Sequence, residues 1–356
     1  MTKTPEHTSW QRGMGRVALV ATVLAAVVVM LGAWTRLVDA GLGCPDWPGC
    51  YGFLTVPQGA EQIALAEARF PHAPVDASKG WPEMIHRYAA AILGLVVFGL
   101  AGFAFCHRRH GLPWKLPLFL AGFILLQGAF GMWTVTLKLW PQVVALHLLG
   151  GFTTLSLLAL LSIRLLARWE PPAPQLGRWR GWLFGGLLLV IGQIALGAWT
   201  AANYAAVACP DLPTCQDQWW PAMDFRHGFD ITQQVGPNYL GGQLTADGRV
   251  AIHLSHRLGA LVVLVYWSLL LLKVWPACTR RRQCQALGLV AVTLLAQIGL
   301  GLLNVALHLP LAIAVAHNAM GAALLIAIIH LLWRTRPASP QPATVAPSPF
   351  NQEATV

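Results

Sequence analysis

Charged residues are scarce in this chain of 356 residues: Asp, Glu, Lys and Arg make up 11% of it, whereas 56% is hydrophobic. The mean hydropathy is +0.56. So little charge cannot cover a water-exposed surface, which excludes an ordinary soluble globular protein. Acidic residues are the scarcer kind, with 14 against 24 basic residues. The distribution of that positive excess along the chain therefore becomes informative.

Long apolar segments take the place of charge. Each approaches the roughly 20 residues that a helix needs to cross a hydrocarbon core about 30 Å thick. They lie at about 17–36, 83–105, 116–137, 142–166, 182–202, 251–273, 286–307 and 311–333. Basic residues precede the first segment, as in a signal peptide. It is too long for one, and no small-residue cleavage site follows, so we expect a true span. The sequence predicts an all-α integral membrane protein with eight transmembrane helices.

The basic residues set the orientation. With eight spans both termini lie on one side, and the tails and loops of that side hold 16 of the 24 Lys and Arg but only 3 of the 14 acidic residues. By the positive-inside rule this side is cytoplasmic. We therefore expect a multi-pass protein of the cell (inner) membrane with both termini in the cytoplasm. The net charge of +10 follows from this topology and requires no nucleic-acid partner.

The second half of the chain repeats the first. Leu31-Gly32-Ala33-Trp34-Thr35 returns at 196–200, and Cys44-Pro45-Asp46 returns at 209–211. After a longer loop, His86-Arg87 returns at 256–257 and His147 at 317. Each copy has an even number of spans, so the copies share one orientation. We expect two tandem parallel four-helix bundles with pseudo-twofold symmetry along the membrane normal.

This repeat divides the chain into five parts. We expect a cytoplasmic N-terminal tail (1–16), an N-terminal four-helix bundle (17–168), a Pro-rich cytoplasmic linker (169–180), a C-terminal four-helix bundle (181–335) and a disordered cytoplasmic tail (336–356). The C-terminal tail is rich in Pro, Ala and Ser and poor in large apolar residues, so we do not expect it to fold. Two outer loops, at about 37–82 and 203–250, are long, and we assign no role to the part of the second from 216 to 250.

Only seven cysteines are present. Four fall in the two long outer loops, on the oxidising side, and form two closely spaced pairs, Cys44 with Cys50 and Cys209 with Cys215. We expect two disulfides. A zinc site is the alternative, although no histidine shares the spacing. The inner three, at 106, 278 and 284, are expected to be unpaired thiols.

Four histidines lie at repeat-related places within the apolar segments: His86, His147, His256 and His317. Ligand-capable side chains inside a membrane are costly and usually functional. The residue four positions after each one, on the same helical face, is small: Ala90, Gly151, Ala260 and Gly321. Gly128, Gly131, Gly299 and Gly301 thin the neighbouring walls further. A flat porphyrin needs such a surface, and histidines from two helices can ligate its iron from both faces. We pair His86 with His147 and His256 with His317.

Polar residues beside these histidines distinguish the two halves. Arg87 and Arg257 each follow a histidine and are suited to binding haem propionates, although an arginine snorkelling from a helix end would look the same. Glu83 lies three residues before His86, and its repeat equivalent is His253. A carboxylate beside a metal cofactor can move protons. We therefore expect the first half to react and the second to carry electrons or to hold the fold. An interfacial glutamate that anchors the helix is the alternative.

These residues together resemble the haem A synthase family of the cytochrome-oxidase assembly pathway. The resemblance rests on Glu83-Met84-Ile85-His86-Arg87-Tyr88, His147, the outer cysteine pairs, His256-Arg257 and His317-Asn318-Ala319-Met320-Gly321. It implies that haem O, the substrate, binds near His86 and His147, that Glu83 is essential to turnover, and that haem b lies between His256 and His317. The activity implied is oxidation of the C8 methyl group of haem O to a formyl group, giving haem A. In the family, Cys44 and Cys50 correspond to cysteines linked to activity in some members, whereas Cys209 and Cys215 look structural.

The resemblance further implies haem O synthase as substrate donor, an electron donor that the sequence does not identify, and cytochrome oxidase assembly factors as partners. Membrane lipid surrounds the protein, and a homo-oligomer is left open. Two other functions fit parts of the pattern. A di-haem b membrane cytochrome would pass electrons between quinol and an outer partner, without chemistry on the haem. A quinone-linked thiol oxidant would depend on the outer cysteines and not on His256 and His317.

Overall fold

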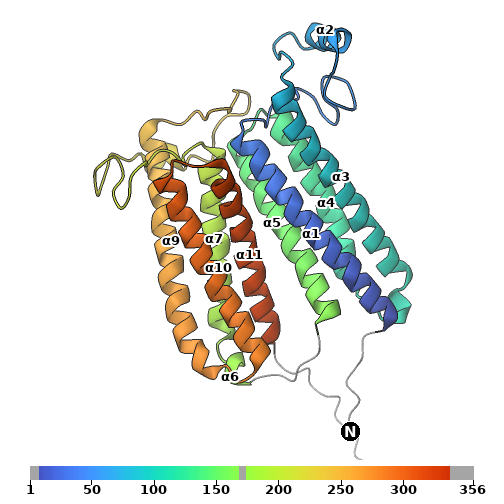
Figure 1. The fold of residues 1–356 in the computed structure, drawn as a ribbon, viewed down its shortest axis with the longest axis vertical. Helices are drawn as coiled ribbons and strands as arrows, with labels where there is room; N and C mark the ends of the chain where they lie inside the picture. The colour runs from blue at the N-terminus through green and yellow to red at the C-terminus, as the bar shows by residue number, and fades with distance from the viewer. Residues whose placement is uncertain (1–7, 168–173, 337–356) are drawn as a thin grey trace, which may run out of the picture.

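The computed structural model describes residues 8–167 and 174–336. These residues contain eight helices that are long and apolar enough to cross a membrane (Figure 1). They are α1 (Ser9–Leu37), α3 (Ala77–Cys106), α4 (Lys115–Thr136), α5 (Pro141–Leu166), α7 (Arg180–Ala202), α9 (Ala246–Val274), α10 (Arg281–Ala306) and α11 (Leu311–Arg334). For the described residues, an all-helical architecture with eight candidate spans is confirmed. Residues 1–7, 168–173 and 337–356, which include part of the predicted N-terminal tail, part of the linker and nearly all of the C-terminal tail, lie outside the described residues.

Several helices begin before the apolar segments that predicted them. Helix α1 starts at Ser9 because Thr8 caps it: the Thr8 hydroxyl accepts from the Gln11 N–H, and the Gln11 side chain accepts from the Thr8 N–H. Side chains of Asp76 and Thr245 cap α3 and α9 in a similar way. Apolar length therefore marks the part of a helix that lipid can cover, whereas a capping residue marks its true beginning.

The spans of each half pack on one another. Helix α1 contacts α3 and α5, and α4 contacts the same two helices. In the second half, α7 and α10 each contact α9 and α11. The two sets of four lie side by side in Figure 1, and α1 and α5 meet α7 and α11 where the halves adjoin. The described part of the core runs through both halves and includes the fully buried Trp267 of α9.

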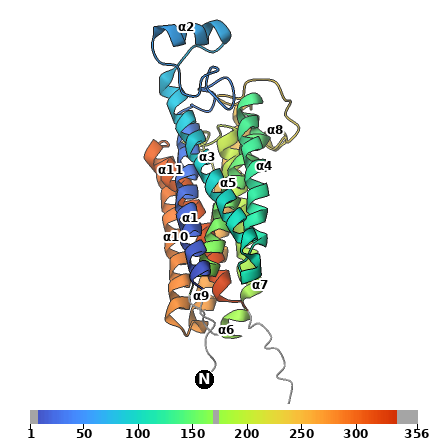
Figure 2. The same cartoon turned by 90° about the vertical axis from the view of Figure 1, so that its right-hand side faces the viewer.

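The long connections gather at one end of the helices, named here the loop end, opposite the beginning of α1 (Figure 2). The first connection contains a helix that the sequence did not predict, α2 (Ala60–Arg69). The second contains a single helical turn, α8 (Phe225–Gly228). Disulfides Cys44–Cys50 and Cys209–Cys215 close equivalent turns in the two connections. Both predicted pairs are confirmed, and with their sulfurs joined no thiolates remain there to bind zinc.

The expectation of three unpaired inner thiols is wrong for two of them. Cys278 and Cys284 form a third disulfide. The chain turns between the short helix η2 (Trp275–Ala277) and α10, which brings the two Cα atoms to 5.6 Å. This separation suits a disulfide, and compartment alone could not reveal the turn that creates it. Among the described cysteines, Cys106 is the free one, and it is exposed.

The connection from α7 to α9 crosses onto the first half. The Trp140 indole N–H donates to the Gln233 carbonyl at 2.9 Å, and the Tyr239 N–H donates to the Lys138 carbonyl at 3.0 Å. The Gln142 amide donates to the Ile231 carbonyl at 3.0 Å. Segment 231–239 therefore covers the turn between α4 and α5, a contact that the repeat pattern did not predict.

Candidate functional site

The four intramembrane histidines come from α3, α5, α9 and α11. In the first half, the rings of His86 and His147 lie edge to face, with centroids 6.4 Å apart and planes at 89°. Metal–imidazole bonds are about 2 Å long, so two rings gripping one metal have centroids roughly 6 Å apart. Both rings are only partly buried by protein. This arrangement fits two ligands on opposite faces of a single iron.

In the second half, His256 and His317 lie close enough to interact electrostatically. They too are only partly buried. Nδ1 of His317 and Nε of Arg257 are buried side-chain atoms that have no hydrogen-bond partner among the residues that the structure describes. Such atoms are costly unless something else satisfies them. Imidazole ligands beside an unsatisfied guanidinium nitrogen fit an iron macrocycle with acidic side groups.

Each imidazole lies against a glycine of a neighbouring helix. A Cβ added to that glycine would meet Cε1 of the ring at between 3.0 and 3.2 Å, closer than ordinary van der Waals contact. The pairs are Gly32 with His86, Gly131 with His147, Gly197 with His256 and Gly301 with His317. Each of these four glycines is named here the seat of the ring that it contacts. The space between a seat and its ring is too narrow for a side chain, so the glycine backbone fixes where the ring can lie.

The glycine prediction is only partly matched by these contacts. Gly131 and Gly301 touch the rings as expected, but an added Cβ at Gly128 or Gly299 meets nothing within 4 Å. Sequence reasoning missed Gly32 and Gly197, although both belong to the repeated Leu-Gly-Ala-Trp-Thr motif. Recurrence of a glycine at the same position in both copies of the motif was the signal that could have revealed them.

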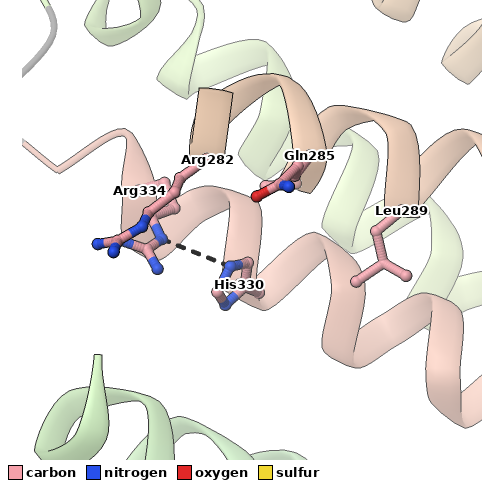
Figure 3. Close-up of a pocket in the computed structure, with 6 residues that line it drawn as sticks. Arg282, Gln285, Leu289, His330 and Arg334 are labelled. Carbon is pink, nitrogen blue, oxygen red and sulfur yellow. Dashed lines mark hydrogen bonds between the residues drawn. The ribbon is translucent and has the colours of Figure 1, made fainter. Parts of the chain in front are cut away.

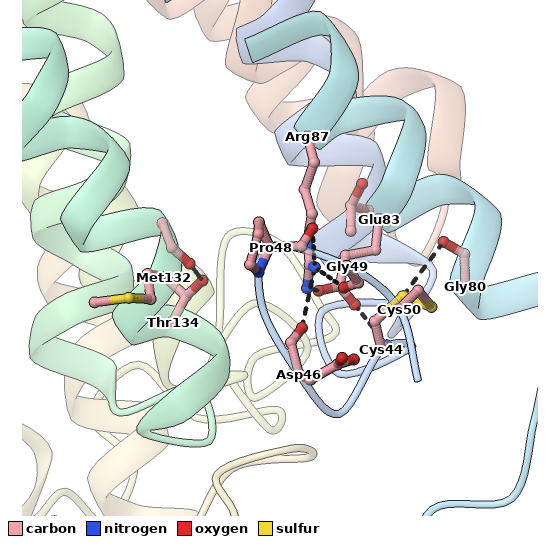
Figure 4. Close-up of polar contacts among 12 residues, drawn as sticks. Cys44, Asp46, Pro48, Gly49, Cys50, Gly80, Glu83, Arg87, Met132 and Thr134 are labelled. Carbon is pink, nitrogen blue, oxygen red and sulfur yellow. Dashed lines mark hydrogen bonds and ion pairs between the residues drawn. A yellow bond between two sulfur atoms is a disulfide. The ribbon is translucent and has the colours of Figure 1, made fainter. Parts of the chain in front are cut away.

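Glu83 is buried, with 4% of its surface exposed, and it is tied to the first disulfide loop (Figure 4). Its Oε2 accepts from the Cys44 N–H at 2.9 Å, and its Oε1 accepts from Arg87. The same guanidinium donates to the carbonyls of Asp46 at 3.0 Å and Gly49 at 2.5 Å. Glu83 precedes His86 by three positions in α3, so the carboxylate lies about one helical turn from the ring. The disulfide loop therefore positions this acid.

The second half replaces the acid with an imidazole. His253, 5% exposed, accepts at Nδ1 from the Cys209 N–H at 3.2 Å, as Glu83 does from Cys44. Arg257 donates to the carbonyls of Asp211 at 2.9 Å and Cys209 at 2.5 Å. The two loops are thus held in the same way, but only the first half offers a carboxyl group beside its histidine pair.

The remaining polar groups are separate from these histidines. A cavity of about 240 Å³ is lined by Arg282, Gln285, Leu289, His330 and Arg334 (Figure 3). These residues lie at the start of α10 and the end of α11. Within residues 8–167 and 174–336, no group of three or more His, Cys, Asp or Glu could hold a bare metal ion. Paired imidazoles remain the ligand sets that the described chain offers.

The sequence matches a family model described as a cytochrome oxidase assembly protein, over residues 15–329. It is 44% identical over 323 residues to a heme A synthase of Shewanella oneidensis, covering 89% of this chain and 95% of that protein. It is 32% identical to a heme A synthase of Methylorubrum extorquens, covering 97% and 94%. A Caulobacter heme A synthase is 30% identical, covering 89% and 94%. Each similarity extends over both halves.

Proposed function

We propose that this chain, which belongs to the cytochrome oxidase assembly protein family, is a haem A synthase. As an oxidoreductase it converts the C8 methyl group of haem O to a formyl group by successive hydroxylations, and the product, haem A, serves cytochrome oxidase. The electron-carrying cytochrome and the thiol oxidant are not favoured, because the extended similarity is to heme A synthases. The proposals about residues concern how this chain performs that oxidation.

The first half receives the substrate. His86 and His147 ligate the iron of haem O, supported by their 6.4 Å separation and by the glycine seats beneath both rings. Glu83 holds or passes a proton at the edge of this site, because its buried carboxyl group lies one turn from His86. The observation that carries this assignment is the asymmetry: the equivalent position of the second half is His253.

The second half holds haem b through His256 and His317. Support comes from the seats at Gly197 and Gly301 and from the unsatisfied nitrogen of Arg257. When bound there, haem b would supply a redox centre, and His256 and His317 would be the residues that hold it. The chain's own contribution is to fix both rings and to exclude water between the helices.

Arg87 and Arg257 stand where haem propionates would approach the loop end. Both guanidiniums already hold carbonyls of a disulfide loop, so each would link the position of a propionate to that loop. Disulfide Cys44–Cys50 keeps the Cys44 N–H against Glu83. Cys209–Cys215 does the same for His253 and has a structural role.

The organisation proposed is two tandem parallel four-helix bundles, at 17–168 and 181–335, related by pseudo-twofold symmetry along the membrane normal. The sequence repeats and the packing of α1, α3, α4 and α5 separately from α9 and α10 support it. The charge distribution supports an inner-membrane protein with cytoplasmic termini. Haem O synthase is the proposed substrate donor, alongside a separate electron donor and assembly factors of cytochrome oxidase.

Replacing Glu83 with Gln tests the assignment. The amide keeps an oxygen that can accept from the Cys44 N–H but cannot exchange a proton as a carboxyl group does. We expect haem O to accumulate and haem A to disappear, while the C-terminal haem b stays bound. Chromatography of haems extracted from the purified membrane protein measures all three.

His253→Gln is the matched control, because its amide oxygen can also accept from the Cys209 N–H. This variant should continue to make haem A. Production of haem A at the normal rate by Glu83→Gln would contradict the proposed role, and so would loss of haem A from both variants alike.

A further inference from the structure

Two cavities flank the last turns of α11. Helix α11 ends, and α10 begins, opposite the loop end, because α9 leads there from the second long connection. The first cavity, described above, lies between α10 and α11 (Figure 3). The second, of about 260 Å³, lies between α11 and the first-half helices α1 and α5. His330 and Arg334 line both cavities. One imidazole and one guanidinium therefore serve two neighbouring hollows.

The charge around these cavities is positive. Arg282 and Arg334 bring guanidinium groups to the first cavity. Two more, from Arg164 and Arg336, lie 6.0 and 3.6 Å from the ring centre of Trp333, one residue before Arg334. Burial, followed by the positive charges of Arg164 and Arg334, lowers the pKa of Arg336. Cations gathered so closely repel one another, and a bound anion would relieve that repulsion.

Acidic side chains are absent from the described residues of this end. Every Asp and Glu within residues 8–167 and 174–336 lies between 39 and 83 or between 211 and 247, in or beside the two long connections. The described chain therefore brings positive charge and hydrogen-bond donors to the end of α11, but no carboxylate. Such a surface is complementary to an anion.

Apolar side chains form the walls of the cavities that face the membrane. Leu289 of α10 lines the first cavity and is 47% exposed, and Leu19 of α1 lines the second and is also 47% exposed. Ile163 and Leu166 of α5 add hydrocarbon surface to the second. On helices long enough to cross a membrane, exposed leucines contact lipid chains. A phospholipid carries a phosphate group and hydrocarbon chains in one molecule, whereas a free phosphate ion has no chains to place against these walls.

We infer that the two cavities at the end of α11 bind one anionic phospholipid, whose phosphate group is held by Arg282, His330 and Arg334. Its chains lie against Leu19 and Leu289. Basic pockets between membrane helices bind anionic headgroups, and a guanidinium can donate two parallel hydrogen bonds to phosphate oxygens. Because the second cavity lies where α11 packs on α1 and α5, this lipid contacts both halves of the chain. The site goes beyond the proposed function and does not depend on haem chemistry.

Arg334→Gln tests the inference, because Arg334 lines both cavities. The full-length chain, depleted of lipid in detergent, is titrated with phosphatidylglycerol, and native mass spectrometry counts the bound lipid. We expect the variant to bind about fivefold more weakly than the unmodified chain, the effect of one arginine beside an anionic headgroup. Arg109→Gln removes a cation of the same end that lines neither cavity, and should bind like the unmodified chain. Thermal unfolding checks that both variants fold.

Three further measurements identify the occupant. Phosphatidylcholine with the same chains has no net charge and should bind to the unmodified chain about fivefold more weakly than phosphatidylglycerol. Inorganic phosphate should not displace bound phosphatidylglycerol, since it lacks the chains. Glu353→Gln removes the acidic side chain of the C-terminal tail and should leave the affinity unchanged.

Each measurement has an outcome that would overturn the inference. The first is equal binding of phosphatidylglycerol by the unmodified chain and a folded Arg334→Gln variant. The second is equal binding of the two lipids by the unmodified chain, and the third is displacement by inorganic phosphate. A tighter affinity in Glu353→Gln would assign the cavities to the tail of this chain and not to a lipid.

Discussion

At the scale of single residues, four missing Cβ atoms determine where the imidazoles lie. Gly32, Gly131, Gly197 and Gly301 occur on four different helices, yet each faces Cε1 of one histidine at nearly the same distance. A glycine within a helix lowers its intrinsic stability by about 1 kcal/mol relative to alanine. Because glycine has no side chain, however, the imidazole ring can approach the helix backbone closely.

Gly197→Val should therefore displace His256. The added Cβ would begin 3.2 Å from Cε1, and the valine methyls would press further into the ring. We expect the variant to fold but to lose most of its haem b, measured as pyridine haemochrome per mole of protein. Gly192→Val on the same helix is the control, since a Cβ there meets nothing within 4 Å. Equal haem content in the two variants would contradict the claim that Gly197 fixes the position of the His256 ring.

At the scale of elements, each disulfide loop is closed around a carboxylate. Oδ1 of Asp211 accepts from the Gln216 N–H at 2.6 Å, and Oδ2 accepts from the Thr214 hydroxyl and the Asp217 N–H. Asp46 holds the first loop through the N–H groups of residues 51 and 52. The repeated Cys-Pro-Asp sequence thus combines a covalent closure with a hydrogen-bonded one.

Acidification should loosen the second loop. The Thr214 hydroxyl and two backbone N–H groups lower the pKa of Asp211 below its usual value. A folded-state pKa below the unfolded one means that the stabilisation is present above the unfolded pKa and is lost as pH falls through the folded pKa. At neutral pH, a water-soluble phosphine should reduce the Cys209–Cys215 bond faster in the Asp211→Asn variant than in the unmodified chain. The ratio of the two rates should approach one in acid; a ratio independent of pH would contradict this.

The contact between α7 and α9 gives a second prediction at this scale. Trp267 is fully buried against Gly186, where an added Cβ would lie 2.6 Å from the indole. Gly186→Val should lower the free energy of unfolding by about 1–3 kcal/mol, the usual cost of overpacking. Thermal unfolding in detergent measures the change, and Gly192→Val again serves as control. If the stability of Gly186→Val were unaltered, the two helices could move apart to accommodate valine without a loss of free energy of unfolding.

At the scale of the whole molecule, the two halves are joined by more than the chain. Arg36 of α1 donates to the Ala201 carbonyl at 2.5 Å, and its guanidinium lies 3.6 Å from the centre of the Tyr204 ring. The segment from 231 to 239 covers the α4–α5 turn. Helices α5 and α7 and helices α1 and α11 also pack directly. These contacts hold the two repeats together as a single structural unit.

Splitting the chain after residue 170 and co-expressing the two parts tests this unity. A tag on either part should recover both, because the packing of α1 and α5 on α7 and α11 does not depend on the covalent link. The ratio of the two parts after purification is the measurement. Recovery of the tagged part alone, with its histidines intact, would show that the interface is too weak to hold the halves together.

The sequence already determined the eight candidate spans, the disulfides Cys44–Cys50 and Cys209–Cys215, and the recurrence of four histidines. Each depends on local chemistry: lipid requires apolar length, an oxidising compartment allows paired cysteines, and ligand-capable side chains are costly within a membrane. The contrast between Glu83 and His253 was visible for the same reason, since aligned repeats can be compared position by position.

Only the tertiary structure decided what faces each imidazole. Gly32 and His86 lie on different helices, and the distance between their side-chain positions depends on how α1 and α3 pack, which no repeat spacing reveals. The crossing of segment 231–239 onto the first half has the same origin. The third disulfide, by contrast, is a local turn with the same cysteine spacing as the other two pairs, and it was missed because an inner location was taken to exclude it. Interactions between helices arise from the relative placement of whole elements, whereas hydropathy, capping and cysteine spacing are properties of one segment at a time.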